Sequence, residues 1–180
     1  MSTDNYIKAG RITALISFLL GTLIFGLYYL TSEGGVLFMG YGYILVAGII
    51  NLAALFVILA KAINDNENRK RLLMTSGLIL VNIPVMVLYC WFAIVLLNTM
   101  RITFMNKTGT KLTDINIVGC GGAYISELEK GESETVWVKI KGDCGIHVDY
   151  LLDEQRKKRD VTGYVTKGMG GKMTYIFVKQ

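Results

Sequence analysis

Charged residues are almost missing from the first half of this chain. Of the 33 charged residues among 180, only ten precede Asn98, and residues 72–97 form a run of 26 without one. A soluble helix is rarely apolar around its whole circumference over such a length, whereas a helix that crosses about 30 Å of hydrocarbon needs roughly 20 such residues. The scarcity of charge therefore excludes an ordinary soluble protein and predicts a small integral membrane protein.

Histidine is equally scarce, since it occurs once, and cysteine occurs three times. In the C-terminal part only Cys120, Cys144 and His147 are evident as metal ligands, whereas a structural zinc site needs four. His147 shares a strand face with Asp149, but no serine or threonine is marked as the nucleophile that such a pair would serve. No phosphate-binding loop occurs either. We therefore expect no metal, no cofactor and no catalytic residues.

Three uncharged stretches are long enough to span a bilayer, at residues 12–30, 36–60 and 72–97. Lysines and arginines near their ends number two before the first stretch, none between the first and second, and four between the second and third. The positive-inside rule then places the N-terminus in the cytoplasm and, after three crossings, the C-terminal domain outside it. We expect a multi-pass protein of the plasma (inner) membrane, with a transmembrane domain over residues 1–98 and an extracytoplasmic domain over residues 99–180.

Two asparagines lie inside the predicted spans, Asn51 in the second and Asn82 in the third. They stand ten residues before Lys61 and eleven after Arg71, so at about 1.5 Å per residue their depths in the bilayer match. We expect an intramembrane polar pair joined by a hydrogen bond worth about 0.6–2 kcal/mol. The alternative is a polar pathway for a substrate or ion, although no ionisable residue lies in any span.

After Asn98 the hydrophobic period changes to two. Apolar and polar residues alternate in short segments that are separated by turn sequences rich in glycine, asparagine and aspartate. The segments are residues 101–104, 115–117, 124–128, 135–140, 146–150, 161–165 and 173–178. About seven short strands in roughly 80 residues is typical of an immunoglobulin-like sandwich. The predicted fold is a membrane α-helical bundle of three transmembrane helices, followed by an all-β, immunoglobulin-like sandwich.

Three motifs carry a resemblance to a known group of proteins. They are Asn-Lys-Thr-Gly at 106–109, Leu-Glu-Lys-Gly-Glu-Ser at 128–133, and the strand that alternates valine with tryptophan at 136–138. Together they resemble small immunoglobulin-like domains on bacterial envelope proteins. With the three spans, the whole chain is similar to a group of uncharacterised bacterial three-span membrane proteins. The resemblance implies the sandwich fold and carries no activity onto any residue.

Cys120 and Cys144 are the two cysteines outside the predicted spans, and both adjoin turns. An oxidising compartment favours a disulfide between them, and two free thiols are the alternative. Trp137 is predicted to point to the polar face of its strand. A large exposed aromatic residue there is a candidate contact to a protein partner or to the bilayer surface.

The densest basic run is expected at the tip of a hairpin and consists of Arg156, Lys157, Lys158 and Arg159. Such a run is a candidate contact to lipid headgroups or to another anionic surface such as a partner, although a well-solvated hairpin tip is the favoured explanation. The whole C-terminal part holds 13 basic and 10 acidic residues. This excess is too small to indicate nucleic-acid binding.

These observations lead to two functional hypotheses. The first is a non-enzymatic membrane protein that presents its sandwich for protein–protein contact, as an accessory or structural subunit of a larger envelope assembly or as a homo-oligomer. The alternative is a membrane effector or channel whose C-terminal β-domain senses a small ligand and rearranges the spans. The alternative is most natural with that domain in the cytoplasm, so topology discriminates between the two.

Overall fold

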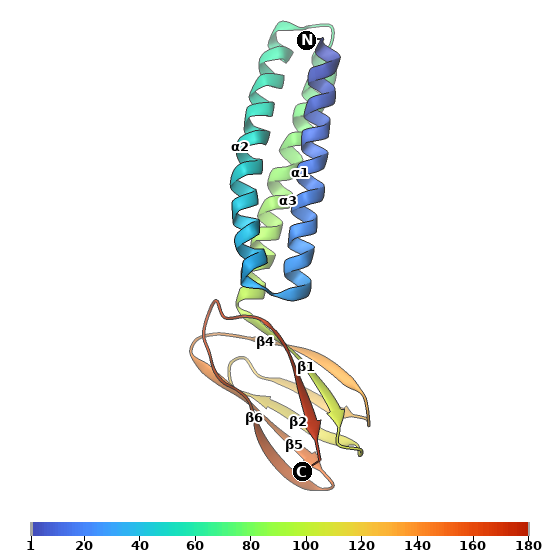
Figure 1. Ribbon diagram of the computed structural model, residues 1–180, viewed down its shortest axis with the longest axis vertical. Coiled ribbons are helices and arrows are strands. Elements are labelled where there is room, and N and C mark those ends of the chain that lie inside the picture. Colours follow the sequence, from blue (N-terminus) through green and yellow to red (C-terminus); the bar gives the residue numbers. More distant parts are fainter. Residues whose placement is uncertain (1, 180) are drawn as a thin grey trace. The chain divides into compact units, whose positions relative to one another are not determined.

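The computed structural model describes residues 2–179, in which three long helices precede seven strands (Figure 1). The helices are α1 (Thr3–Thr31), α2 (Gly34–Asn64) and α3 (Arg69–Leu97). The strands are β1 (Thr99–Lys107), β2 (Leu112–Val118), β3 (Ala123–Leu128), β4 (Ser133–Lys139), β5 (Cys144–Leu152), β6 (Gln155–Val165) and β7 (Lys172–Val178). The predicted fold class, a helical bundle followed by a β-sandwich, is confirmed.

The three helices have 29, 31 and 29 residues and are long and apolar enough to cross a membrane. Each extends beyond its predicted span, because the polar residues that flank the apolar run are helical too. The first helix, for example, begins at Thr3. Most large apolar side chains of the helices are exposed on their outer surfaces, which suits a lipid environment.

Contacts between the helices gather around small residues. Gly10 of α1 leaves no room for a side chain, since an added Cβ would lie 2.3 Å from Cδ1 of Ile58 in α2. Small residues at such crossings let two backbones approach closely, which stabilises helix pairs in lipid. The buried cluster of the bundle consists of Ile7, Ala14, Ile58, Ala62, Leu72 and Ile79.

The strands form two sheets, ordered β3-β2-β5-β6 and β4-β1-β7, and β7 runs parallel to β1. Their inner faces enclose a core whose most deeply buried members include Phe104, Ile115, Val148 and Phe177. The central β2–β5 pair corresponds to the B–E pair of a constant-type immunoglobulin domain. The order of the other strands differs from the ABED and CFG sheets of that domain.

By its internal contacts the chain divides into two compact units, one ending at Ala93 and one beginning at Ile94. The last turn of α3 therefore belongs to the same unit as the strands. Asn98 alone separates α3 from β1. Its side-chain amide donates to the carbonyl oxygen of Ile94 at 2.8 Å, and the Thr99 hydroxyl donates to that of Val95 at 2.7 Å. These bonds satisfy carbonyls that a helix end leaves without partners.

Two turns of the sandwich complete this helix end. The backbone N–H of Gly170, between β6 and β7, donates to the carbonyl oxygen of Leu97 at 2.8 Å. The N–H of Ile140, just after β4, donates to the carbonyl oxygen of Asn98 at 2.9 Å. The β4–β5 and β6–β7 turns are thus held at the end of the sandwich where the helix enters.

Candidate functional site

The structure joins Cys120 and Cys144 in a disulfide, with their Cα atoms 5.3 Å apart. Cys120 lies in the β2–β3 turn, where Gly119 and Cys120 both adopt left-handed backbone conformations (φ 103° and 51°). An added Cβ at Gly119 would lie 1.9 Å from the carbonyl oxygen of Gly145, so only glycine fits this approach to β5. The bond ties the β2–β3 turn to the start of β5, while Cys90 in α3 stays free.

The predicted Asn51–Asn82 pair is corrected by the structure. The Asn51 amide donates to the Ser17 hydroxyl at 2.6 Å and to the carbonyl oxygen of Ala47, in its own helix, at 2.7 Å. The Asn82 amide donates to the carbonyl oxygen of Ala14 at 3.0 Å. Both asparagines therefore bond to α1. Equal depth brings two residues to one level of the bundle, but the rotation of each helix decides which neighbour its side chain meets.

The basic run at 156–159 also differs from the prediction, because it does not form a hairpin tip. The turn consists of Asp153 and Glu154, both left-handed (φ 50° and 62°), and β6 begins directly after them. Two consecutive left-handed residues make a hairpin turn whose twist matches that of the strands. Arg156 forms an ion pair with Asp114 of β2.

Pairing with β5 separates the four basic side chains onto two faces. Lys157 and Arg159 pair with Tyr150 and Val148, which are core residues, and so they lie on the inner face at the sheet edge. Inward charges on an edge strand discourage pairing with other chains.

The possible contact of this run with lipid or a partner stays a prediction, and the strand fixes only where along β6 the run lies. Its residues open β6, whereas the helix end is approached by the turn that follows β6. Val165 comes nine residues after Arg156 along the strand, which corresponds to about 30 Å.

The outer face of the three-stranded sheet, which we call the basic sheet face, carries no acidic residue. Its members are the strand positions that alternate with core residues, and the pairing register places them in rows. Four are basic and none is Asp or Glu. They are Thr99, Arg101, Thr103, Met105 and Lys107 in β1, Ser133, Thr135, Trp137 and Lys139 in β4, and Lys172, Thr174, Ile176 and Val178 in β7.

Trp137 lies in one row of the basic sheet face with Arg101 and Lys172. The Arg101 guanidinium carbon is 5.6 Å from the centroid of the Trp137 ring, a cation–π distance. The exposed fractions are 47% for Trp137, 43% for Ile176 and 54% for Val178. Arg101 itself is buried, so the basic groups open to contact on this face are Lys107, Lys139 and Lys172.

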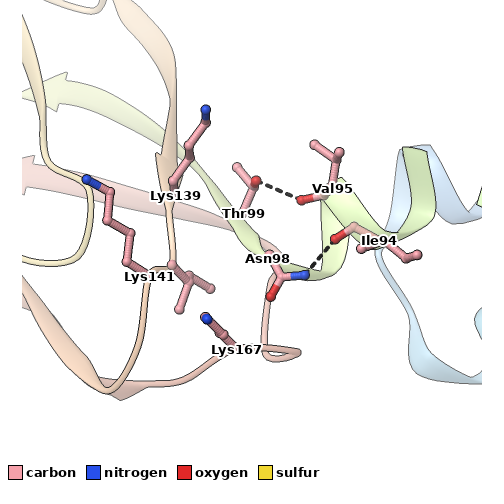
Figure 2. A pocket seen from close by; sticks show the side chains of 8 residues that line it. Ile94, Val95, Asn98, Thr99, Lys139, Lys141 and Lys167 are labelled. Carbon is pink, nitrogen blue, oxygen red and sulfur yellow. Dashed lines mark hydrogen bonds between the residues drawn. The ribbon is translucent and has the colours of Figure 1, made fainter. Parts of the chain in front are cut away.

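A hollow of about 520 Å³ lies where the last turn of α3 enters the sandwich. Figure 2 shows Ile94 and Val95 on its helix side, lysines on its sandwich side, and Asn98 and Thr99 between them. We call it the lysine pocket, and it is lined by Ile94, Val95, Asn98, Thr99, Lys139, Ile140, Lys141 and Lys167.

Sequence reasoning did not select the three lysines of this pocket, because Lys167 lies 26 residues after Lys141 in the sequence. They come from the end of β4, the β4–β5 turn and the β6–β7 turn. What the three lysines share is that each lies at or just after the end of a strand that runs towards α3. The sequence alone does not give the direction of the strands, so this common feature could not be used to find them.

Comparisons with known proteins add little. No protein-family model matches the chain, and no curated protein matches it significantly. An NMR structure of a protein from Eubacterium rectale aligns with 45% of this chain and 78% of its own, at 12% sequence identity and a TM-score of 0.35. A likeness this low supports no conclusion about function, so the resemblance to bacterial envelope proteins stays an expectation from the sequence.

Proposed function

We propose that this protein is a non-enzymatic membrane protein that binds an acidic segment of a partner protein through the basic sheet face, as an accessory subunit of an envelope assembly. The observation that carries the proposal is the charge of that face. It exposes Lys107, Lys139 and Lys172 and no acidic residue, and it holds the exposed Trp137 beside the buried Arg101.

The composition of the face matches what protein contacts require. Tryptophan and arginine are enriched among residues that dominate binding energy. Complementary charge accelerates encounter and rejects partners of the same sign. The outer face of the four-stranded sheet makes a useful contrast, since the alternating positions there include Glu127, Asp149 and Asp160. Charge complementarity thus favours an acidic partner for the basic sheet face alone.

The proposal includes an orientation, with the N-terminus in the cytoplasm and the sandwich outside it. The four basic residues at the facing ends of α2 and α3 and the disulfide both support this arrangement. The basic residues are Lys61, Arg69, Lys70 and Arg71. A reporter enzyme that is active only outside the cytoplasm, fused after the last residue, tests it. Activity confined to the cytoplasm would favour the ligand-sensing effector or channel instead.

Site-specific photo-cross-linking in the native cells tests the contact. A cross-linking amino acid at Ile176 should yield one defined adduct with a protein that contains an acidic segment. Replacing Lys107 and Lys172 by glutamate should abolish that adduct, because the face then repels acidic groups. The matched control places the cross-linker at Tyr124, which is 58% exposed on the other sheet and should yield none.

Two results of this experiment would reject the proposal. An adduct between two copies of this chain would make the face a homo-oligomer interface. Equal products from positions 176 and 124 would show that the contacts do not depend on the face.

A further inference from the structure

We propose that the lysine pocket binds the phosphate group of an anionic phospholipid. The pocket shares Thr99 and Lys139 with the basic sheet face, whereas Lys141, Lys167 and the apolar residues of α3 belong to the pocket alone. The pocket combines a cationic side, made by Lys139, Lys141 and Lys167, with an apolar side made by Ile94, Val95 and Ile140.

The cationic side is assembled by bonds to the helix end. Lys139 and Lys141 flank Ile140, whose N–H donates to the carbonyl oxygen of Asn98 at 2.9 Å. Lys167 lies in the turn whose Gly170 N–H donates to the carbonyl oxygen of Leu97 at 2.8 Å. Backbone bonds therefore hold the segments that carry the three lysines at the end of α3, and the three side chains are exposed.

The charge of the pocket has no internal counter-charge. Among the described residues, Lys139, Lys141 and Lys167 form no ion pair, and the lining contains no carboxylate. By contrast, Lys111 contacts both Glu127 and Glu129, and Arg156 pairs with Asp114. Three lysines without an ion-pair partner line one hollow, and lysine binds a phosphate as a point charge.

The apolar side indicates that this phosphate belongs to a lipid. Ile94 and Val95 form part of α3, a helix long and apolar enough to cross a membrane, and the helix ends at Leu97. The pocket therefore lies at the level where an apolar span gives way to water, which is where lipid headgroups lie. Clustered lysines close to a membrane surface attract anionic headgroups. A hollow of about 520 Å³ is in the size range of small-molecule sites, about 300–1,000 Å³.

Native mass spectrometry of the full-length protein in a neutral detergent tests the inference. The probes are phosphatidylglycerol, which is anionic, and phosphatidylcholine, which has no net charge. The protein should bind phosphatidylglycerol at least tenfold more tightly than phosphatidylcholine. The variant K139Q/K141Q/K167Q should lose this preference, and the variant with arginine at the three positions should keep it.

The matched control is K107Q/K130Q/K158Q, which removes the same charge from lysines outside the pocket that form no ion pair in the described chain. It should bind phosphatidylglycerol like the unmodified protein. If both triple variants lose the preference for phosphatidylglycerol equally, net charge explains the effect and the proposal is wrong. The proposal is also wrong if K139Q/K141Q/K167Q keeps the preference for phosphatidylglycerol. A final competition experiment adds glycerol phosphate, a soluble phosphate without acyl chains, to the protein with phosphatidylglycerol. If it competes at the concentration that suffices for the lipid, the pocket is a site for soluble phosphates and the lipid assignment is wrong.

Discussion

The side-chain amide of Asn82 in α3 donates a hydrogen bond to the carbonyl oxygen of Ala14 in α1, 3.0 Å away. Three residues further along α1, the Ser17 hydroxyl accepts a bond from Asn51 of α2 at 2.6 Å. The first helix is thus the common partner of the other two, and each of these interhelical bonds can be removed separately.

Replacing Asn82 or Asn51 by leucine should lower the free energy of unfolding by about 0.6–2 kcal/mol each, because each change removes one interhelical bond in an apolar medium. The double variant should be additive within about 0.5 kcal/mol, since the two side chains do not bond to each other. Unfolding in mixed detergent micelles measures both quantities. Asn64, whose amide bonds only within its own helix at Ala60, provides the control. A coupling energy between Asn51 and Asn82 above about 0.5 kcal/mol would instead indicate that the two side chains bond to each other.

Replacing both Cys120 and Cys144 by serine should destabilise the protein by about 3 kcal/mol, because the bond closes a loop with a sequence separation of 24. Denaturant unfolding of the full chain measures this loss, and a reductant should reproduce it in the unmodified protein. Replacing Cys90 by serine is the control and should change little. Reaction of both Cys120 and Cys144 with a thiol reagent in the untreated, folded protein would contradict the bond.

The acid stability of the α2–α3 loop should depend on Thr3. Its hydroxyl donates to Oδ2 of Asp65 at 2.7 Å and is the largest of the causes that hold the pKa of Asp65 below its usual value. A lowered pKa favours the ionised carboxylate in the folded state, so its contribution is present above about pH 4 and is lost as the pH falls further.

The variant Thr3→Val should therefore lose less stability than the unmodified protein between about pH 5 and pH 2. The free energy of unfolding across this range measures the difference. Thr31→Val is the matched control, since that hydroxyl donates to the carbonyl oxygen of Leu27 and accepts from the backbone N–H of Glu33, and neither partner is a carboxylate. Parallel pH profiles for all three proteins would show that the Thr3–Asp65 bond does not act in solution.

Replacing Gly170 by alanine should disturb the helix end. An added Cβ would lie 2.2 Å from the carbonyl oxygen of Leu96 and 2.6 Å from that of Leu97. Such overpacking typically costs about 1–3 kcal/mol, which thermal unfolding of the full chain would detect. The neighbouring variant Gly171→Ala is the control, because the nearest atom to its Cβ would be Sδ of Met100 at 3.9 Å. Equal effects of the two changes would contradict the close approach.

The sequence by itself determined the features that depend on local patterns. Runs without charge identified the three helices, because the cost of charge in hydrocarbon is set residue by residue. Alternation with a period of two identified the strands and the sandwich, since a half-buried strand exposes every second side chain. Two cysteines beside turns predicted the disulfide that the structure contains.

Only the tertiary structure decided which side chains meet. Helix rotation turned Asn51 and Asn82 towards α1, although their depths were readable from the sequence. Strand direction carried the densest basic run to the end of β6 away from α3, and it gathered Lys139, Lys141 and Lys167 around the helix end. The hydrophobic pattern of one segment indicates which of its own side chains are buried. Which side chains from two separate segments come into contact depends on how those segments pack against each other.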